Sequence, residues 1–283
     1  MKIGILGGTF NPVHNGHLSI ANDVRALLAL DQIIFIPAKT PALKLGKEIL
    51  PADLRYKLVE KAIQSEPSFA ISDIEFNRAG PSYSVQTLKS LHKALNCKSS
   101  ELFFILGVDA FLEIKKWWHY QELFSLANFV VVTRAGIELN LRRINSIAEE
   151  VGFCYNGDIE LTIKGFQNGN ETRKQPFISI TAPSANPTIR QQISDKTDKI
   201  SENPEFGRSY TASEENNFKR EGNKPRMILD YKNSSNLTLT LVSATPIFVS
   251  STDIRERLSR GLSISELVPN GVCNLIKEVI QTK

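Results

Sequence analysis

Short apolar runs alternate with amphipathic segments along the first half of the chain. The apolar runs predict strands, and they end at glycine, proline or polar residues: 3–6, 32–37, 69–76, 102–106 and 129–134. The amphipathic segments between them have apolar residues at helical spacing: 18–28, 51–65 and 84–95. Strands that alternate with helices predict a parallel α/β sheet.

This pattern weakens between residues 155 and 236, where Asn, Ser, Thr, Lys and Glu dominate. Such a stretch buries little apolar surface, so we expect its middle, roughly 183–226, to be a disordered loop. Residues 159–163 and 177–181 could pair as a small hairpin. An inert surface loop is the favoured interpretation of the stretch, because long surface loops are tolerated; a partner-binding segment is the alternative.

The strand pattern returns at 237–242, and helices are expected at 250–259 and 269–281. We therefore predict a core made of residues 1–154 and 237–283. An insertion, 155–236, would interrupt this core before its last strand.

The N-terminal strand runs through Gly7 and Gly8 into a turn with two of the four histidines, His14 and His17. A strand that passes through glycines into a helix N-terminus forms an anion site, because free backbone N–H groups and the helix dipole converge there. Imidazoles three residues apart share one face of the first turn, so both can reach the same phosphate. Gly16, between them, lets a bulky ligand approach the backbone. We interpret this turn as a nucleotide-phosphate site.

Other interpretations of this turn are weaker. Its glycine spacing differs from the dinucleotide-binding G-x-G-x-x-G, and the chain has no G-x-x-x-x-G-K-[ST]. Zinc binding by the two histidines lacks a nearby carboxylate or thiolate to complete a tetrahedral set. A tight turn with two incidental histidines is the remaining alternative.

A second candidate phosphate site spans residues 249–255. Hydroxyl and N–H groups at a helix start bind phosphate oxygens, and Arg255, one turn in, can donate two parallel hydrogen bonds to another pair. Taken alone, the segment could equally be an ordinary helix N-cap.

The stretch from Gly8 to His17 resembles the T/H-x-G-H signature of the nucleotidyltransferase superfamily, whose members join a nucleotide to a phosphate ester and release pyrophosphate. Over roughly 1–135 and 237–283, the chain resembles the nicotinate-nucleotide adenylyltransferases of bacterial NAD biosynthesis. The resemblance implies a Rossmann-like open parallel sheet with helices on both faces. It also implies ATP and nicotinate mononucleotide as substrates, Mg²⁺ carried by ATP, and deamido-NAD and pyrophosphate as products.

The resemblance also assigns roles to matching positions. Charge neutralisation and positioning of the phosphates would come from His14, His17 and Arg255. ATP would be bound by Gly8, Thr9, Phe10, Gly16, Gly107, Asp109, Ser250, Ser251 and Thr252, with Asp109 accepting from the ribose. Nicotinate mononucleotide would be bound through its carboxylate, ring and phosphate by Ser84, Trp117, Trp118, Lys44 and Arg134.

Three positions depart from the family pattern. Asn11 stands where many members have Asp, and a structural role is favoured there over metal binding. Ser84 replaces the usual Thr, and Leu43 replaces a His. Because adjacent helical residues do not share a face, at least one of Trp117 and Trp118 is expected in the core.

Composition narrows the class of protein further. The chain is 41% hydrophobic and 23% charged with a formal net charge of +4, and no dense Lys/Arg block indicates nucleic acid as a partner. No apolar run approaches the roughly eighteen residues of a membrane span, and the N-terminus has no signal-peptide pattern. Three scattered cysteines without metal spacing indicate a reducing, cytoplasmic compartment. The sequence leaves the oligomeric state undecided, and a homo-oligomer is one of the alternatives.

The sequence leaves three alternative functions open. Nicotinamide mononucleotide or pantetheine phosphate could replace the acid nucleotide as acceptor. The Ser82–Ser84 segment with Trp117 suits a flat acidic ring and disfavours pantetheine, whereas a hydroxyl can bond either the acid or the amide. A non-catalytic nucleotide sensor is the alternative of another class, and the intact His14, His17 and Arg255 disfavour it.

Overall fold

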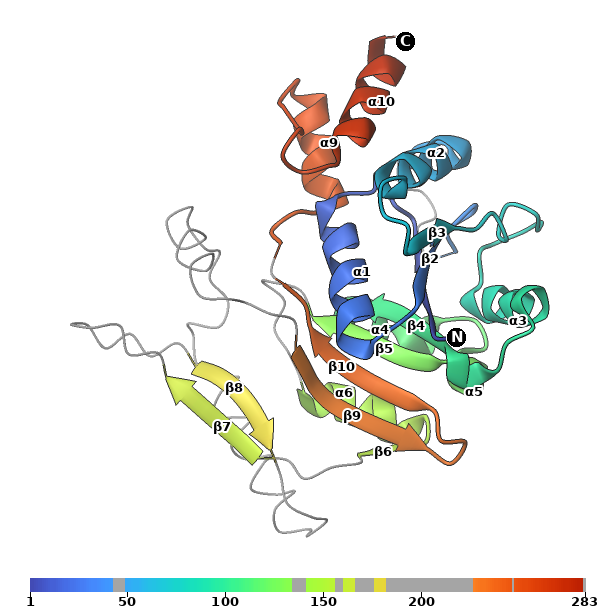
Figure 1. Cartoon of the computed structure of the whole chain (residues 1–283), viewed down its shortest axis with the longest axis vertical. Helices are drawn as coiled ribbons and strands as arrows, with labels where there is room; N and C mark the ends of the chain where they lie inside the picture. The colour runs from blue at the N-terminus through green and yellow to red at the C-terminus, as the bar shows by residue number, and fades with distance from the viewer. Residues whose placement is uncertain are drawn as a thin grey trace.

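The computed structural model describes residues 1–42, 49–133, 141–155, 160–165, 176–181, 226–245 and 247–281. Within these ranges, eight strands form one sheet in the order β3-β2-β1-β4-β5-β10-β9-β6 (Figure 1). From β3 to β10 all neighbours pair in parallel. The parallel strands are β1 (Ile3–Gly8), β2 (Gln32–Pro37), β3 (Phe69–Ile71), β4 (Leu102–Gly107), β5 (Asn128–Thr133) and β10 (Thr238–Ser243). The predicted open parallel α/β sheet is confirmed.

Two antiparallel strands extend this sheet. β9 (Arg226–Asn233) pairs with β10, and β6 (Phe153–Tyr155) pairs with β9. β9 lies inside the segment assigned to the insertion, so residues 226–233 belong to the sheet and the core resumes before residue 237. Apolar residues alternate at Met227, Leu229 and Tyr231, but this pattern was too short to predict a strand within a polar stretch.

A separate two-stranded ladder lies outside the main sheet. β7 (Glu160–Gly165) and β8 (Pro176–Thr181) pair antiparallel, with Glu160 opposite Thr181. The predicted pairing of this hairpin is confirmed. The expected loop at 183–226 lies outside the described residues except for Arg226.

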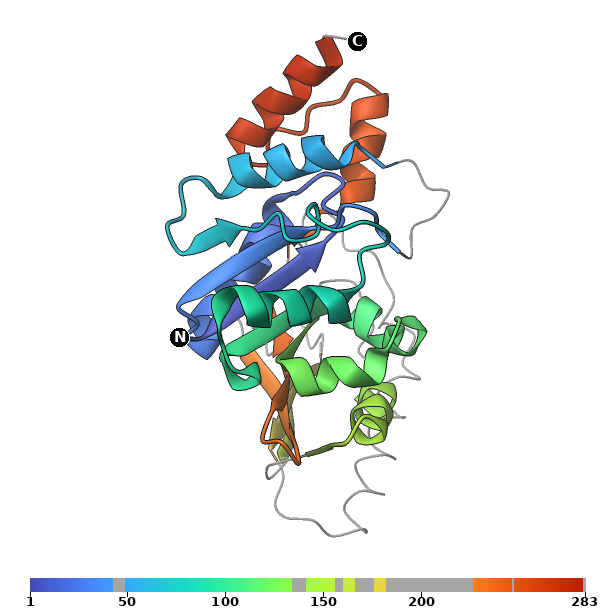
Figure 2. The ribbon, with the colours of Figure 1, turned by 90° about the vertical axis from the view of Figure 1, so that its right-hand side faces the viewer.

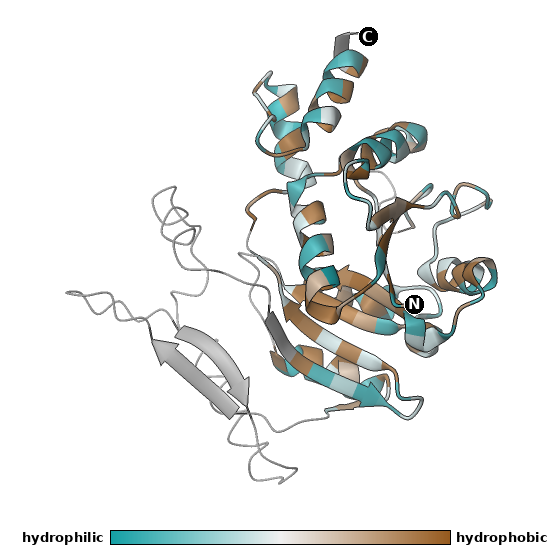
Figure 3. Cartoon of the chain, in the orientation of Figure 1, coloured by the Kyte–Doolittle hydropathy of each residue, from teal (hydrophilic) through white to brown (hydrophobic). Residues whose placement is uncertain are grey.

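Helices cover both faces of the sheet. One face packs against α3 (Ser84–Leu95), α4 (Val108–Leu112), α5 (Tyr120–Leu126) and α6 (Leu141–Glu150). The other packs against α1 (Asn15–Leu28) and α2 (Ala52–Ile63). The helices α9 (Ser251–Ser259) and α10 (Asn270–Gln281) join the same core, and α10 packs on α2 (Figure 2). Consecutive β2 residues alternate between the two cores, Ile33 and Phe35 to one and Ile34 and Ile36 to the other. Because both faces are buried, the central strands are apolar along their length (Figure 3).

The boundaries of α1, α2, α3, α9 and α10 follow the predicted ranges closely, but α4, α5 and α6 were not predicted. In α6 the buried residues Leu141, Ile144, Ile147 and Ala148 recur at helical spacing. The strand expected over 69–76 stops at Ile71, because the chain turns where the Phe76 N–H donates to the Asp73 carbonyl. Among the described residues, no helix has both the length and the hydropathy that crossing a membrane requires.

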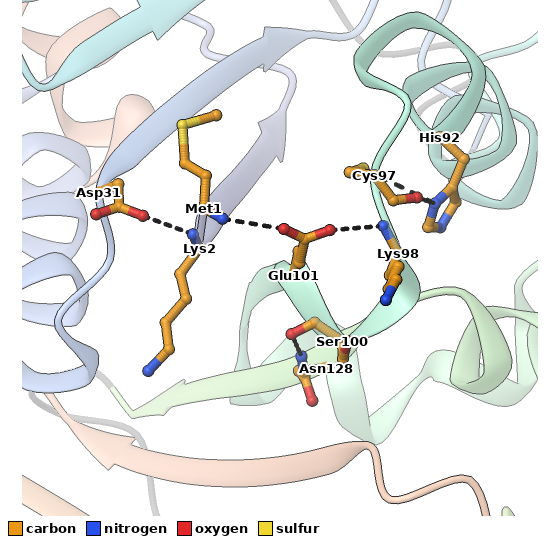
Figure 4. Close-up of polar contacts among 9 residues, drawn as sticks. All are labelled: Met1, Lys2, Asp31, His92, Cys97, Lys98, Ser100, Glu101 and Asn128. Atoms are coloured by element: carbon orange, nitrogen blue, oxygen red, sulfur yellow. Dashed lines mark hydrogen bonds and ion pairs between the residues drawn. The ribbon is translucent and has the colours of Figure 1, made fainter.

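Polar contacts hold the amino ends of the central strands together (Figure 4). The Met1 ammonium and the Lys98 N–H both donate to the Glu101 carboxylate, each over 2.9 Å. Asn128, at the start of β5, donates to the Ser100 carbonyl over 3.0 Å. The polar groups at the amino ends of the strands are therefore hydrogen-bonded to one another. In open α/β sheets ligands bind at the opposite, carboxyl ends, where the two sequence motifs lie.

Candidate active site

The junction between β1 and α1 positions His14 and His17. The His14 backbone N–H donates to Nδ1 of His17 over 3.2 Å, and the His17 N–H donates to the His14 carbonyl over 2.9 Å. An Nδ1 that accepts a hydrogen bond places the proton of a neutral imidazole on Nε2. Nε2 of His17 is then a hydrogen-bond donor, which is what a phosphate oxygen requires.

Ring contacts restrain both imidazoles. The ring centroids of His14 and His17 are 3.7 Å apart with an interplanar angle of 33°, and Phe10 packs edge-on against His17 at 5.0 Å. His14 is only 3% exposed, whereas His17 is half-buried. A side chain held by packing keeps its geometry as substrate arrives, so His17 is preorganised.

Gly16 is needed for a reason that the sequence did not reveal. A Cβ at this position would lie 3.0 Å from Nδ1 of His14 and 3.2 Å from Cγ1 of Val249. The expected space for a ligand is therefore filled by two protein side chains. One of them, Val249, belongs to the second motif, so Gly16 lets the two motifs pack together.

The second motif is hydrogen-bonded to the first. Nη1 of Arg255 donates to the carbonyl oxygens of Asn11, over 2.8 Å, and Ser251, over 3.0 Å. The Ser251 hydroxyl donates to the Pro12 carbonyl over 2.9 Å. The N-terminus of α9 therefore lies beside the loop that leads to His14.

The hydroxyls of the second motif have different partners. Ser250 is the N-cap of α9: its Oγ accepts from the Asp253 N–H over 3.1 Å and lies 2.7 Å from the Asp253 carboxylate, to which it donates. The Thr252 Oγ1 accepts from Nη2 of Arg255 over 3.2 Å, and Thr252 is exposed. Ser250 thus performs the capping role that the sequence left as an alternative and occupies the Asp253 N–H, while Thr252 is exposed at the same helix start.

The remaining residues of the first motif shape the loop. Gly8 ends β1, where an added Cβ would lie 3.2 Å from the Phe10 ring. Phe10 adopts a left-handed backbone conformation with φ 46°, and its side chain packs in the core. The Asn11 Oδ1 accepts from the Leu50 N–H over 2.9 Å, which agrees with the structural role expected at this position.

Gly107 and Asp109 lie at the carboxyl end of β4, the direct neighbour of β1. Gly107 ends the strand and precedes α4, and Asp109 is an exposed residue of the first turn of α4. Both are therefore at the same edge of the sheet as the two motifs, as the sequence predicted.

The residues expected to recognise a flat ring come from α3 and the segment before α5. Ser84 is the first residue of α3, and the preceding Tyr83 stacks on Trp118 with centroids 4.8 Å apart and planes at 29°. Trp118 is 44% exposed, whereas Trp117 is half-buried and packs edge-on against Phe104 of β4 at 6.3 Å. Trp117 packs against the core as expected, but neither tryptophan lies in a helix, so the helical argument behind that expectation was wrong.

Two predicted residues lie outside the part of the chain that the structure describes. These are Lys44 and Arg134, the expected partners of the substrate phosphate.

One buried arginine beside the site was not among the predicted residues. Arg55 of α2 is 1% exposed, and Nη1 of its guanidinium donates to the Thr9 carbonyl over 2.7 Å. Its pKa is lowered by burial, an effect partly offset by the Glu75 carboxylate. A signal existed, because Arg55 occupies the apolar stripe of its helix with Leu58, Val59 and Ala62.

The described residues include no group of three or more His, Cys, Asp or Glu side chains that could hold a metal ion. The donors that converge on the two motifs are instead N–H groups, an imidazole and a guanidinium, which suit anions.

An open α/β sheet with an imidazole and a guanidinium beside the junction after its first strand is typical of a nucleotide-binding α/β protein. A family model described as cytidylyltransferase-like matches residues 5–257, and the chain belongs to this family of nucleotidyltransferases.

Known relatives agree with this class of enzyme. A probable nicotinate-nucleotide adenylyltransferase of Geotalea daltonii is 47% identical over 156 residues, which are 55% of this chain and 71% of that protein. One of Geotalea uraniireducens is 48% identical over 158 residues, with the same coverage of both chains. Among solved structures, nicotinic acid mononucleotide adenylyltransferase of Plasmodium falciparum complexed with NaAD gives a TM-score of 0.44 at 17% identity, over 50% of this chain and 69% of that one.

Proposed function

We propose that this protein is a nicotinate-nucleotide adenylyltransferase, which transfers AMP from ATP to nicotinate mononucleotide. A phosphate oxygen of the mononucleotide attacks the α-phosphorus of ATP, and the bond from the α-phosphorus to the bridging oxygen of the β-phosphate breaks. The products are deamido-NAD and pyrophosphate. The nucleophile is already an anion, so the reaction needs positioning and charge stabilisation rather than a general base.

One observation carries the proposal: the hydrogen bond from Arg255 to the Asn11 carbonyl joins the two phosphate motifs. The N-terminal turn of α1 and the start of α9 are thereby held beside one another. Each supplies a helix dipole, although the Asn15 and His17 N–H groups of α1 donate to the Leu267 and His14 carbonyls and the Asp253 N–H of α9 donates to Ser250 Oγ. Together with the His17 imidazole and the Arg255 guanidinium, two such dipoles at one place suit a polyphosphate better than either alone.

The side chains at this place have distinct proposed roles. His17 donates from Nε2 to the α-phosphate, and His14 holds the His17 ring by stacking. Arg255 has five N–H donors, of which the described hydrogen bonds use three, so its remaining donors can neutralise the developing charge on the phosphates. The backbone of the Gly8–Phe10 loop, Ser250, Ser251 and Thr252 would surround the triphosphate, whereas Gly16 acts by letting His14 and Val249 pack together.

Mg²⁺ is proposed to enter with ATP. Mg²⁺ prefers oxygen ligands and usually keeps several waters while it binds substrate phosphates, so a dedicated protein cage is not required. The donor set near His17 fits this mode, since it is made of cationic and N–H groups, and Asn11 Oδ1 is bonded to the Leu50 N–H. When bound, the ion withdraws charge from the triphosphate oxygens.

The mononucleotide is proposed to bind at the carboxyl edge of the sheet near α3, which lies on the face opposite to α1. Ser84 and the N–H groups of the first turn of α3 would bond the ring carboxylate, and Trp117 and Trp118 would offer aromatic surface to the ring. Gly107 and Asp109 would contact the ATP ribose from the end of β4. Lys44 and Arg134 would bind the phosphate of the mononucleotide.

A coupled pyrophosphate assay tests the function. The purified chain is incubated with ATP, Mg²⁺ and, in separate reactions, nicotinate mononucleotide, nicotinamide mononucleotide and pantetheine phosphate, and the dinucleotide product is identified by chromatography. We expect the highest kcat/KM with the acid nucleotide and no turnover after chelation of the metal. A preference for another acceptor would overturn the substrate assignment, and binding of ATP without pyrophosphate release from any acceptor would indicate a nucleotide sensor.

A further inference from the structure

The guanidinium of Arg55 bonds backbone of two loops, the one that follows β1 and the connection from β2 to α2. Nη1 donates to the Thr9 carbonyl over 2.7 Å, Nε to the Leu50 carbonyl over 2.9 Å, and Nη2 to the Lys39 carbonyl over 3.1 Å. Each of these carbonyls belongs to a loop outside regular structure, and Arg55 itself is 1% exposed. One rigid planar group thus fixes the loop after β1 and both ends of the β2–α2 connection relative to α2.

The first of these loops carries the phosphate motif and is held by three hydrogen bonds. Besides the bond to Thr9, the Leu50 N–H donates to Asn11 Oδ1 over 2.9 Å, so the Leu50 peptide connects Arg55 to the next turn of the same loop. The bond from Arg255 to the Asn11 carbonyl reaches this loop from its other side. Arg55 therefore supports the loop on which His14 and His17 depend.

The second of these loops leads to the proposed ring site. After Lys39, the Thr40 N–H donates to Oγ of Ser82 over 3.2 Å, and the Ser82 N–H donates to the Thr40 carbonyl over 2.8 Å. Nζ of Lys39 also donates to the Phe76 carbonyl over 2.9 Å. Ser82 lies two residues before Ser84, the first residue of α3. A continuous series of hydrogen bonds thus runs from the phosphate loop through Arg55 to the start of α3.

A buried carboxylate supports this series electrostatically. Glu75 is 8% exposed, and its field favours the charged form of Arg55. Oε1 of Glu75 accepts from the Thr87 hydroxyl of α3 over 2.6 Å. A charged guanidinium is costly to bury alone, so Glu75 stabilises Arg55 and at the same time fixes the first turn of α3.

We propose that Arg55 is a positioning residue that holds the ATP side of the site in register with the mononucleotide side. This inference rests on the proposed function, because it assumes that one substrate binds at each side. Arg55 has no surface from which to contact either substrate, so it acts through the loops. Its loss should leave each substrate able to bind but misalign the attacking oxygen and the α-phosphorus, and a misplacement of about 1 Å can cost about 100-fold in rate.

Arg55→Lys and Arg55→Met test the proposal. Lysine keeps the charge opposite Glu75 but cannot bond three carbonyls in one plane, and methionine keeps only the packing volume. We expect kcat to fall about 100-fold in both variants. The affinities of the separate substrates, measured by calorimetry with a non-hydrolysable ATP analogue and by tryptophan fluorescence with nicotinate mononucleotide, should stay close to those of the wild type.

Asn128→Ala is the matched control. Asn128 is also buried and also bonds backbone of distant segments, Ser100, Leu102 and Thr238, but at the amino ends of the strands. It should lower the melting temperature without lowering kcat, measured well below the melting transition. A kcat unchanged in folded Arg55→Lys would overturn the proposal, as would an equal loss in Asn128→Ala.

Amide hydrogen exchange provides a readout that needs no turnover. Arg55→Lys should accelerate exchange at the N–H groups of Leu50 and Ser82 together, and Asn128→Ala at neither. Acceleration at only one of them would show that Arg55 does not link the two sides. This measurement tests the positioning role of Arg55 even if the pyrophosphate assay shows that the acid nucleotide is not the substrate.

Discussion

Nη1 of Arg255 lies 2.8 Å from the main-chain oxygen of Asn11, although 244 residues separate the two in sequence. This bond, with the one from Ser251 to Pro12, unites the two ends of the nucleotidyltransferase core at one edge of the sheet. The position of α9 therefore depends on a loop folded from the N-terminus, and so does the charge that α9 presents.

Arg255→Lys should lower kcat/KM for ATP by about 10- to 100-fold, because lysine keeps the charge but cannot bond both the loop and a phosphate. The assay is pyrophosphate release at varied ATP concentration. Arg257→Lys is the control, since Arg257 lies on the same helix and its guanidinium donates to the Ser263 carbonyl, away from the N-terminal loop. Equal losses in the two variants would argue against a specific role for Arg255.

Replacements of His17 can separate its two hydrogen bonds. His17→Asn retains an acceptor near Nδ1 for the His14 N–H but has no donor at Nε2, whereas His17→Gln places an amide N–H near Nε2. Loss of a phosphate donor typically costs about 10²–10³ in rate, so we expect His17→Ala and His17→Asn to lose this much and His17→Gln to retain more. Circular dichroism should show all three folded. Near-normal kcat in His17→Asn would contradict the assigned role.

Gly16→Ala should both destabilise the fold and reduce turnover. The added methyl would press on His14 and Val249, and overpacking of this kind costs about 1–3 kcal/mol in the free energy of unfolding. Denaturant unfolding measures the first effect and the pyrophosphate assay the second. Gly271→Ala is the matched control, because its methyl meets only the flexible side chain of Lys61. A fully active Gly16→Ala would show that His14 has room to move.

Trp118→Ala should weaken binding of the mononucleotide with little change in stability. Trp118 is 44% exposed, and an aromatic stack contributes about 0.5–1.5 kcal/mol, which corresponds to about a two- to tenfold rise in KM. Steady-state kinetics at saturating ATP measures the change. Trp118→Phe should restore most of the affinity. A KM that is unchanged in the alanine variant would place the ring elsewhere.

Glu101→Gln should reduce stability at neutral pH but not in acid. The hydrogen bond from the Lys98 N–H, followed by that from the Met1 ammonium, lowers the pKa of Glu101 below its ordinary value of 4.5. A depressed carboxyl pKa adds stability that is present above the unfolded-state pKa and is lost as pH falls through the folded-state pKa. Denaturant unfolding across pH 3–7 should therefore show the wild type and the variant converging at the acid end. Parallel curves would refute this assignment.

Local sequence patterns predicted much of the fold. Apolar runs located six strands of the sheet, because strands buried on both faces must be apolar throughout. Glycines, serine caps and helical spacing located α1, α2, α3, α9 and α10. Short-range geometry also placed His14 and His17 on one turn, since residues three apart in a helix share a face.

What the sequence could not decide were the relationships across long separations. Gly16 looked like space for a ligand, and only the packing of Val249 against it showed otherwise. β9 joined the sheet although its neighbourhood is polar, because β10 offered it an unpaired edge. Arg55 stands in the apolar stripe of α2, but its role appeared only when two loops brought three carbonyl oxygens to its buried guanidinium. A sequence specifies which groups are present and how neighbours repeat, whereas the convergence of distant groups depends on the packing of the whole chain.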